Sequence, residues 1–213
     1  IKFPYLKKIG WKGFVDGKDS GVYRVAPLAR LNAADGMATP LAQEAYEKMV
    51  DFYGGKPVHN ILAYHWARAI ELLNAAENIK ILSSDESITE RNLRQEINKV
   101  AGEGVGIVEA PRGTLIHHYR TDEKGIIQDA NLIVATTQNK GAINIAIKKA
   151  AQNFIKKGRV DERILSMIEI AYRAYDLCFA CATHAINNKI PFQLDIYSNE
   201  GKLIKRFENY DLL

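Results

Sequence analysis

The sequence predicts an α+β fold that is mostly helical, with one small antiparallel sheet and a separate C-terminal hairpin. Apolar residues recur at helical spacing in both halves of the chain. Runs of β-forming residues bounded by Gly and Pro stand between these halves, and the tail beyond Pro191 alternates apolar and polar residues. The 213 residues are 47% hydrophobic and 25% charged, which is ordinary for a globular protein.

The N-terminal part predicts a short strand and two helices. Residues 21–25 (GVYRV) have the composition of a strand. A Thr-Pro pair opens the helix expected over about 39–52, because Thr can cap a helix and Pro suits its first position. An asparagine can cap the next helix, expected from 60 to the polar loop at 83–85, where apolar residues recur about every 3.6 positions.

The middle of the chain predicts a change from helix to sheet. Residues 88–100 suggest a short third helix. Two strand-like runs, 104–109 and 114–120, are joined by a Pro-Arg-Gly turn, and a third run covers 126–134. We therefore expect these three runs to form the small antiparallel sheet.

The C-terminal part predicts two more helices and a hairpin. Both helices, at about 139–157 and 162–175, have clear apolar stripes. Beyond them, two alternating runs are separated by the polar turn at 198–201, which is typical of a β-hairpin.

Charge and composition argue against several classes of partner. The net charge is only +4, and the basic stretch 148–159 recurs at helical spacing beside apolar residues, which favours a solvated helix face over nucleic-acid binding. No apolar run approaches the roughly 18 residues of a membrane span. No export signal is visible, so a cytoplasmic location is expected. The start at Ile1 lacks an initiator Met and suggests the middle of a longer polypeptide, or a processed or engineered start.

The chemistry of the chain is concentrated in residues 176–184, which include its two cysteines, Cys178 and Cys181, and His184. On a helical turn the C-x-x-C spacing places both sulfurs on one side, since three residues rotate about 300°. Two such thiolates can chelate one soft metal or close into a redox disulfide. His184 lies about 240° round from Cys178 on a regular helix, so the histidine is expected to serve a separate purpose.

Three readings of the cysteine pair remain open at this stage. A structural zinc site needs four ligands, and the sequence has no second Cys/His cluster. A thioredoxin-like redox pair needs a leading βαβ unit, whereas the segment before Cys178 predicts helix. A metal site completed from outside this chain is the third reading.

Four segments of the sequence resemble the large subunit of [NiFe] hydrogenases. Residues 175–184 are similar to the C-terminal D-P-C-x-x-C-x-x-H motif, and residues 109–119 to E-A-P-R-G-x-L-x-H. Residues 134–139 resemble V-P-[ST]-T-x-N, and residues 23–32 resemble a further stretch of the cytoplasmic branch. The resemblance covers nearly the whole chain and leans toward viologen-reducing, non-deazaflavin-reducing, heterodisulfide-reductase-linked or sulfhydrogenase types.

The resemblance implies specific roles around a nickel–iron centre. Cys178 would be a terminal nickel thiolate, and Cys181 would bridge nickel and iron. Arg112 would lie over the open side of the metals, where it can order the diatomic ligands and help to split H₂ as a base. Asp176 would hydrogen-bond this arginine and keep it aimed.

Other positions would carry supporting roles. Thr136 would donate a hydrogen bond to an iron-bound cyanide, and Pro111 would pack beside one. His184 would bind a distant structural Mg or Fe ion. The family is normally cut just after this histidine, so residues 1–184 would be the mature part and Ala185 would begin an extension, 185–213, that is removed once nickel is loaded.

The resemblance also implies what this chain lacks. The family's N-terminal R-x-C-G-x-C motif and nearby glutamate are absent, and Leu177 and Ala135 replace two prolines. The expected cofactors are Ni and an Fe with CO and cyanide. The expected partners are the N-terminal half of the large subunit, an iron–sulfur small subunit, electron-acceptor subunits, nickel-insertion proteins, a maturation endopeptidase and H₂. The alternatives are a non-catalytic scaffold or maturation substrate, and a zinc or thiol-redox module.

Overall fold

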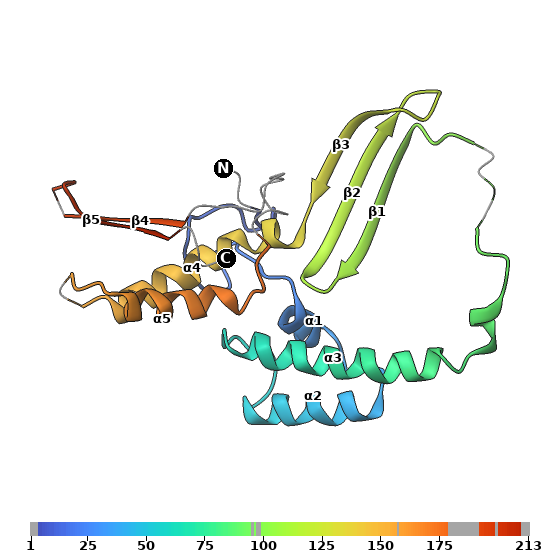
Figure 1. Cartoon of the computed structure of the whole chain (residues 1–213), viewed down its shortest axis with the longest axis horizontal. Coiled ribbons are helices and arrows are strands. Elements are labelled where there is room, and N and C mark those ends of the chain that lie inside the picture. Colours follow the sequence, from blue (N-terminus) through green and yellow to red (C-terminus); the bar gives the residue numbers. More distant parts are fainter. Residues whose placement is uncertain are drawn as a thin grey trace. The chain divides into compact units, whose positions relative to one another are not determined.

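A computed structural model of the chain describes residues 4–94, 96, 99–156, 158–178, 192–198 and 200–209. These residues form five α-helices, one short 3-10 helix, a three-stranded antiparallel sheet and a two-stranded hairpin (Figure 1). The predicted α+β class is therefore confirmed. The chain divides into a large unit, residues 1–177, and a small C-terminal unit, residues 178–213.

Three helices build the main hydrophobic core of the large unit. Helices α1 (Pro27–Ala33) and α2 (Pro40–Phe52) both begin with proline, and both pack against the longer α3 (Ala63–Leu82) (Figure 1). Proline suits the first helical position because its missing N–H would have no intrahelical partner there. The largest fully buried hydrophobic side chains among the described residues come from these helices: Leu28, Leu31, Met49, Tyr64 and Ile70.

The three-stranded sheet follows in simple order along the chain. Strand β1 (Glu103–Ala110) pairs with β2 (Gly113–Thr121), and β2 pairs with β3 (Ile127–Ile133) (Figure 1). Ala110 lies opposite Gly113, so only Pro111 and Arg112 form the turn of the first hairpin. This tight turn fixes the position of the Arg112 backbone relative to both strands.

Two further helices follow the sheet and pack together. Helix α4 (Ala135–Phe154) begins directly after β3, and α5 (Glu162–Arg173) begins with a capping contact in which Ile164 N donates to Asp161 Oδ1 over 3.0 Å. The first turns of α4 bury three polar side chains, of Thr136, Gln138 and Asn139. Buried polar groups need partners, which the site below supplies for Gln138 and Asn139.

The small unit contains the predicted terminal hairpin. Strands β4 (Phe192–Tyr197) and β5 (Leu203–Asn209) are antiparallel, with Asp195 opposite Arg206. Arg206 Nε lies 2.6 Å from Asp195 Oδ1, so the pair is held by an ion pair as well as by backbone hydrogen bonds. The hairpin prediction is confirmed.

Two predicted elements are wrong, and one helix has no counterpart among the predictions. Residues 21–25 are not a strand, because their polar groups bond to other segments: Leu6 N donates to Gly21 O, and Val25 N donates to the Asn139 side chain. The helix expected over 88–100 reduces to the 3-10 helix Glu86–Thr89 within the described residues. Leu93, in the segment where the helix was expected, is 84% exposed, so its side chain gains no burial that would stabilise a helix. Helix α1 is the element that the sequence did not predict.

Helix boundaries also differ from the predictions. Helix α4 starts at Ala135 rather than near Asn139, so Asn139 is a buried residue inside the helix and not its first residue. Helix α3 starts at Ala63, three positions after the predicted asparagine cap. Among the described residues, no helix has the length and apolar character needed to cross a bilayer.

Candidate functional site

The turn that carries Arg112 is held close to the segment before α1. Gly113 has a φ of 128°, in a region that side-chain-bearing residues rarely adopt. A Cβ at this position would meet Val25 Cβ at 2.8 Å and Ala26 N at 3.0 Å. Glycine is therefore required at position 113 for two reasons: the backbone angle and the close approach of a second chain segment.

Arg112 reaches Asp176, which lies 64 residues further along the chain. Arg112 Nε donates to the Asp176 backbone O over 2.9 Å and lies 3.1 Å from Asp176 Oδ2. Arg112 Nη2 also donates to Asp176 Oδ1, over 3.4 Å. The two side chains are 47% and 41% exposed, so the pair is open to solvent on one side. Cys178 follows Asp176 by two positions in the sequence.

The segment that carries Asp176 is anchored on α3. Arg68 Nη2 donates to Ala174 O over 3.0 Å, and the rings of Tyr64 and Tyr175 lie 4.9 Å apart. Ala174 and Tyr175 are almost completely buried. Burial raises the pKa of Tyr175, so this phenol is neutral at physiological pH and packs as an aromatic residue.

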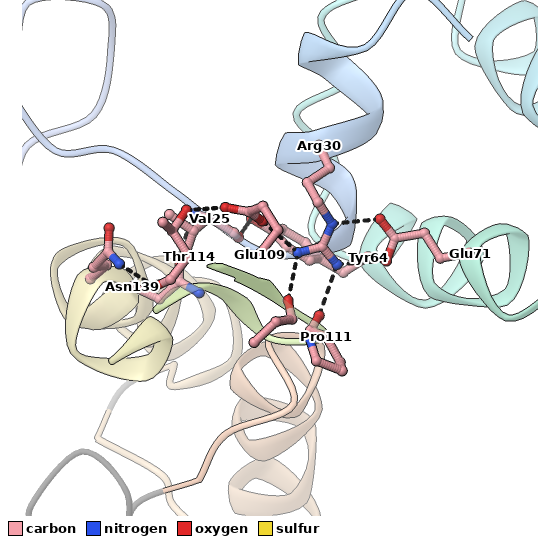
Figure 2. A network of polar contacts seen from close by, with 10 residues as sticks. Val25, Arg30, Tyr64, Glu71, Glu109, Pro111, Thr114 and Asn139 are labelled. Atoms are coloured by element: carbon pink, nitrogen blue, oxygen red, sulfur yellow. Dashed lines mark hydrogen bonds and ion pairs between the residues drawn. The ribbon is translucent and has the colours of Figure 1, made fainter. Parts of the chain in front are cut away.

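A network around Arg30 holds the other side of the turn (Figure 2). Arg30 extends from α1 and pairs with Glu71 of α3 at 2.6 Å and with Glu109 of β1 at 3.0 Å. It also donates to the backbone O atoms of Ala110 and Pro111, each over 2.9 Å. Burial opposes the charge on Arg30, but the hydrogen bonds and charges of the two carboxylates outweigh it and raise the pKa of Arg30.

The buried amides of α4 connect the sheet to the segment before α1. Asn139 Oδ1 accepts a hydrogen bond from Val25 N over 2.8 Å (Figure 2). Gln138 Nε2 donates to Thr114 O over 2.6 Å, and Tyr23 OH donates to Gln138 Oε1 over 3.1 Å. These contacts explain how α4 can bury polar side chains at low cost.

The structure describes some of the predicted site residues and not others. Arg112 and Asp176 are in contact, and Pro111 lies in the turn with its carbonyl bonded to Arg30. Thr136 is buried in the first turn of α4. Cys178 is half-buried and is in a disulfide.

The predicted positions Cys181, His184 and Ala185 lie outside the described residues. Within the part of the chain that the structure describes, no three His, Cys, Asp or Glu side chains are grouped so that they could hold a metal ion. The ligand roles therefore stay predictions.

Two histidines of β2 take part in contacts of the sheet. The Nε2 atom of His118 lies 2.7 Å from Glu103 Oε1, and the Nδ1 atom of His117 lies 2.9 Å from Tyr119 OH.

Sequence reasoning missed Arg30 and Glu71. Arg30 stands in the segment 23–32 that resembles a hydrogenase motif, but nothing in that segment assigns a role to it. Its partners are 41 and 79 positions away, so no local pattern could have revealed them.

Comparison with known proteins identifies a family. The family described as nickel-dependent hydrogenase matches residues 18–184. An iron–sulfur subunit of the F420-non-reducing hydrogenase of Archaeoglobus profundus is 57% identical over 99% of this chain and 43% of its own length. The beta subunit of the NAD-reducing hydrogenase HoxS of Cupriavidus necator is 43% identical over 96% of this chain and 41% of its own length.

A solved hydrogenase structure is also similar to this chain. A crystal structure of an NAD⁺-reducing [NiFe]-hydrogenase in the H₂-reduced state matches with a TM-score of 0.76 and 42% identity. The match covers 84% of this chain and 38% of that chain. The chain thus spans less than half the length of these relatives.

Proposed function

The chain belongs to the nickel-dependent hydrogenase family, and we propose that it is the C-terminal part of a [NiFe] hydrogenase catalytic subunit. In the complete enzyme this subunit would oxidise H₂ reversibly to protons and electrons. The observation that carries the proposal is the contact between Arg112 and Asp176, because it joins two segments that resemble separate hydrogenase motifs. A cytoplasmic location is part of the proposal.

The cysteine pair would hold the metals. Thiolates are soft, electron-rich ligands, and this donor chemistry suits nickel and low-valent iron. Cys178 would be a ligand of nickel and Cys181 a ligand shared by nickel and iron, once a thiol reductant has supplied the two electrons that open the disulfide at Cys178. When bound, the centre supplies the heterolysis of H₂ into hydride and proton. The remaining thiolates would come from the rest of the large subunit, and His184 would bind a separate Mg or Fe ion.

Arg112 and Asp176 would act together beside the centre. A guanidinium presents its N–H donors in a fixed plane, so it can order polar ligands of the iron and stabilise charge that develops as H₂ is split. Asp176 accepts from Arg112 Nε and Nη2 and limits the directions that the side chain can take. Pro111 and Thr136 would border the CO and cyanide ligands.

Electrons would leave through other subunits. Iron–sulfur clusters are usually held by four cysteines, and this sequence has two. An iron–sulfur small subunit would therefore receive the electrons and pass them to acceptor subunits. The relatives are themselves named as subunits of F420-non-reducing or NAD-reducing hydrogenases, which supports an enzyme built from several chains.

Metal analysis and one substitution test the proposal. The complete enzyme should contain nickel and iron and should reduce an artificial dye with H₂. Arg112→Lys should lower kcat about 100-fold, because Lys keeps the charge but loses the planar fork. Arg120→Lys is the matched control, since Arg120 pairs with Asp129 at 3.0 Å on the exposed sheet. Undiminished activity in Arg112→Lys would show that the assigned role is wrong.

A thiol-redox or zinc module is the second candidate, and the disulfide at Cys178 is an observation that favours its thiol-redox form. Under this alternative the purified complex would contain zinc or no metal, and H₂ would not reduce the dye. A chain that binds maturation proteins but no metal would instead support the scaffold alternative.

A further inference from the structure

We infer that Arg30 is a positioning residue, whose guanidinium fixes the two carbonyls that precede Arg112 and thereby sets where the Arg112 side chain lies. The inference rests on the proposed function, because Arg30 would act on catalysis only through Arg112. It extends that function to a residue outside the turn and outside the cysteine segment.

Arg30 uses all five of its N–H groups in the network (Figure 2). Nε donates to Glu71 Oε1 over 2.7 Å, and Nη2 donates to Glu71 Oε2 over 2.6 Å, which is a bidentate pair. Nη1 donates to Glu109 Oε2 over 3.0 Å. The second hydrogen of each terminal nitrogen goes to a carbonyl, from Nη1 to Ala110 and from Nη2 to Pro111, each over 2.9 Å. An ordinary surface ion pair would satisfy one or two of these groups.

The acceptors come from separate elements, so the contact is a junction rather than a local pair. Glu71 belongs to α3, Glu109 to the end of β1, and Ala110 and Pro111 to the end of the strand and its turn. The Arg30 and Glu71 side chains are each 24% exposed, so solvent screens this pair less than an exposed one. Only a planar guanidinium can reach two carboxylates and two carbonyls in these directions, and an ammonium cannot.

The segment 25–30, which carries Arg30, also contacts the turn on the other side of Arg112. Val25 and Ala26, which directly precede α1, lie against Gly113, where a Cβ would come within 3.0 Å of Ala26 N. Residues 25–30 therefore hold the residue after Arg112 by close packing and the two residues before it by hydrogen bonds. None of these contacts uses the Arg112 side chain, which pairs with Asp176.

A double-mutant cycle in the complete enzyme tests the inference. The variants are Arg30→Lys, Arg112→Lys and the double substitution, with Arg120→Lys as control. Arg30→Lys should lower kcat for H₂-dependent dye reduction about 10- to 100-fold, with little change in KM, because Arg30 touches no substrate. The double variant should be within about 3-fold of Arg112→Lys alone, since Arg30 acts through Arg112. Losses that multiply would overturn the inference.

Hydrogen exchange gives a readout that does not depend on hydrogenase activity. Amide exchange in the turn, at residues 112–114, should be faster in Arg30→Lys and unchanged in Arg120→Lys. Unchanged exchange in Arg30→Lys would overturn the inference even if the wild-type enzyme shows no H₂ activity, a result that would count against the proposed function alone. If Arg30→Lys does not assemble, Glu71→Gln weakens the same junction and should give the same pattern with a smaller loss.

Discussion

Ala26 and Asp176 have positive φ angles, of 89° and 54°, although neither is glycine. Such angles cost free energy and persist where the surrounding structure enforces them. Ala26 lies against the turn of Arg112, and Asp176 is bonded to the Arg112 side chain. The two strained positions among the described residues are therefore both at the candidate site, which agrees with a site whose geometry is imposed by its surroundings.

Gly113→Ala should destabilise the chain by about 2–3 kcal/mol, because the new Cβ meets Val25 and Ala26 and the φ angle is unfavourable. Gly125→Ala is the control: Gly125 also has a positive φ, of 80°, but its nearest neighbour would be 3.8 Å away. Chemical denaturation of both variants separates the two effects. Equal losses would mean that the close approach to Val25 and Ala26 does not matter.

At the residue scale the sequence predicted one contact of the candidate site and missed the residues that support it. The motif around Arg112 and the aspartate before Cys178 led to the prediction that their side chains interact, and the structure has them in contact. The role of Arg30 could not be predicted from a motif, because it depends on hydrogen-bond acceptors that folding brings together from α3 and β1. The start of the helix near Asn139 was wrong for a related reason: Asn139 is buried inside α4, where its side chain accepts a hydrogen bond from the distant Val25 N.

Helix α3 supports both partners of the Arg112–Asp176 contact. Tyr64, Arg68 and Glu71 recur at spacings of four and three, which places them on one helix face. Tyr64 and Arg68 contact residues 174–175 before Asp176, while Glu71 holds Arg30 against the arginine turn. One rigid helix thus sets the distance between two segments that lie far apart in the sequence.

The first half of α3 should contribute much more stability than its last turns. Ile70 is 2% exposed in the core, whereas Ile79 on the same helix is 68% exposed. Ile70→Ala should cost about 2–4 kcal/mol through lost burial and a cavity. Ile79→Ala should change stability by less than about 0.5 kcal/mol, because Ala is the better helix former and little burial is lost. Comparable losses in denaturant unfolding would contradict the observed core.

The start of α2 should make stability depend on pH. Glu77 accepts from Thr39 Oγ1 over 2.6 Å and from Ala42 N over 3.0 Å. The Thr39 hydrogen bond, aided by the backbone donors and opposed by desolvation, holds the pKa of Glu77 below its ordinary value of 4.5. A lowered pKa stabilises the fold fully above 4.5, and the stabilisation is lost as pH falls through the lower folded-state value.

Thermal unfolding of Glu77→Gln tests this dependence. The variant should have a lower Tm than the wild type at neutral pH, and the difference should shrink as pH falls below 4.5. Glu44→Gln is the control, because Glu44 makes an exposed ion pair with Lys48 that salt should screen. A Tm difference for Glu77→Gln that stays constant into acid would show that the carboxylate charge is not the cause.

At the scale of elements, prediction succeeded where local pattern and tertiary burial agree. The three strands and their turns, α2, α5 and the terminal hairpin were all expected close to their observed ranges. A helix was predicted over residues 88–100, but Ile88, Leu93 and Val100 are exposed, so burial does not stabilise a helix there. Helix α1 has only seven residues, so its periodicity is too short to recognise.

On the scale of the whole molecule, the described strands of the C-terminal hairpin form no strand pairing with the main sheet. Within the described residues β4 pairs with β5, and β1, β2 and β3 form a separate sheet. Removing the hairpin would therefore break no strand pairing of the sheet that carries Arg112. This independence supports the proposal that residues 185–213 are a maturation extension, cut from the chain between His184 and Ala185 after nickel is loaded.

Nickel should therefore decide the length of the mature chain. If cleavage follows metal loading, removal of the extension reports whether the cysteine pair has bound nickel, because a bound metal restrains its ligands. Mass spectrometry of the protein from nickel-replete native cells should find a chain that ends at His184, and nickel-starved cells should accumulate a chain that still carries residues 185–213. Replacing Cys178 by Ser should give the longer form even with nickel present, because a hydroxyl is a poor nickel ligand. A chain that carries nickel, oxidises H₂ and still carries residues 185–213 would contradict the proposed extension while leaving the hydrogenase assignment intact.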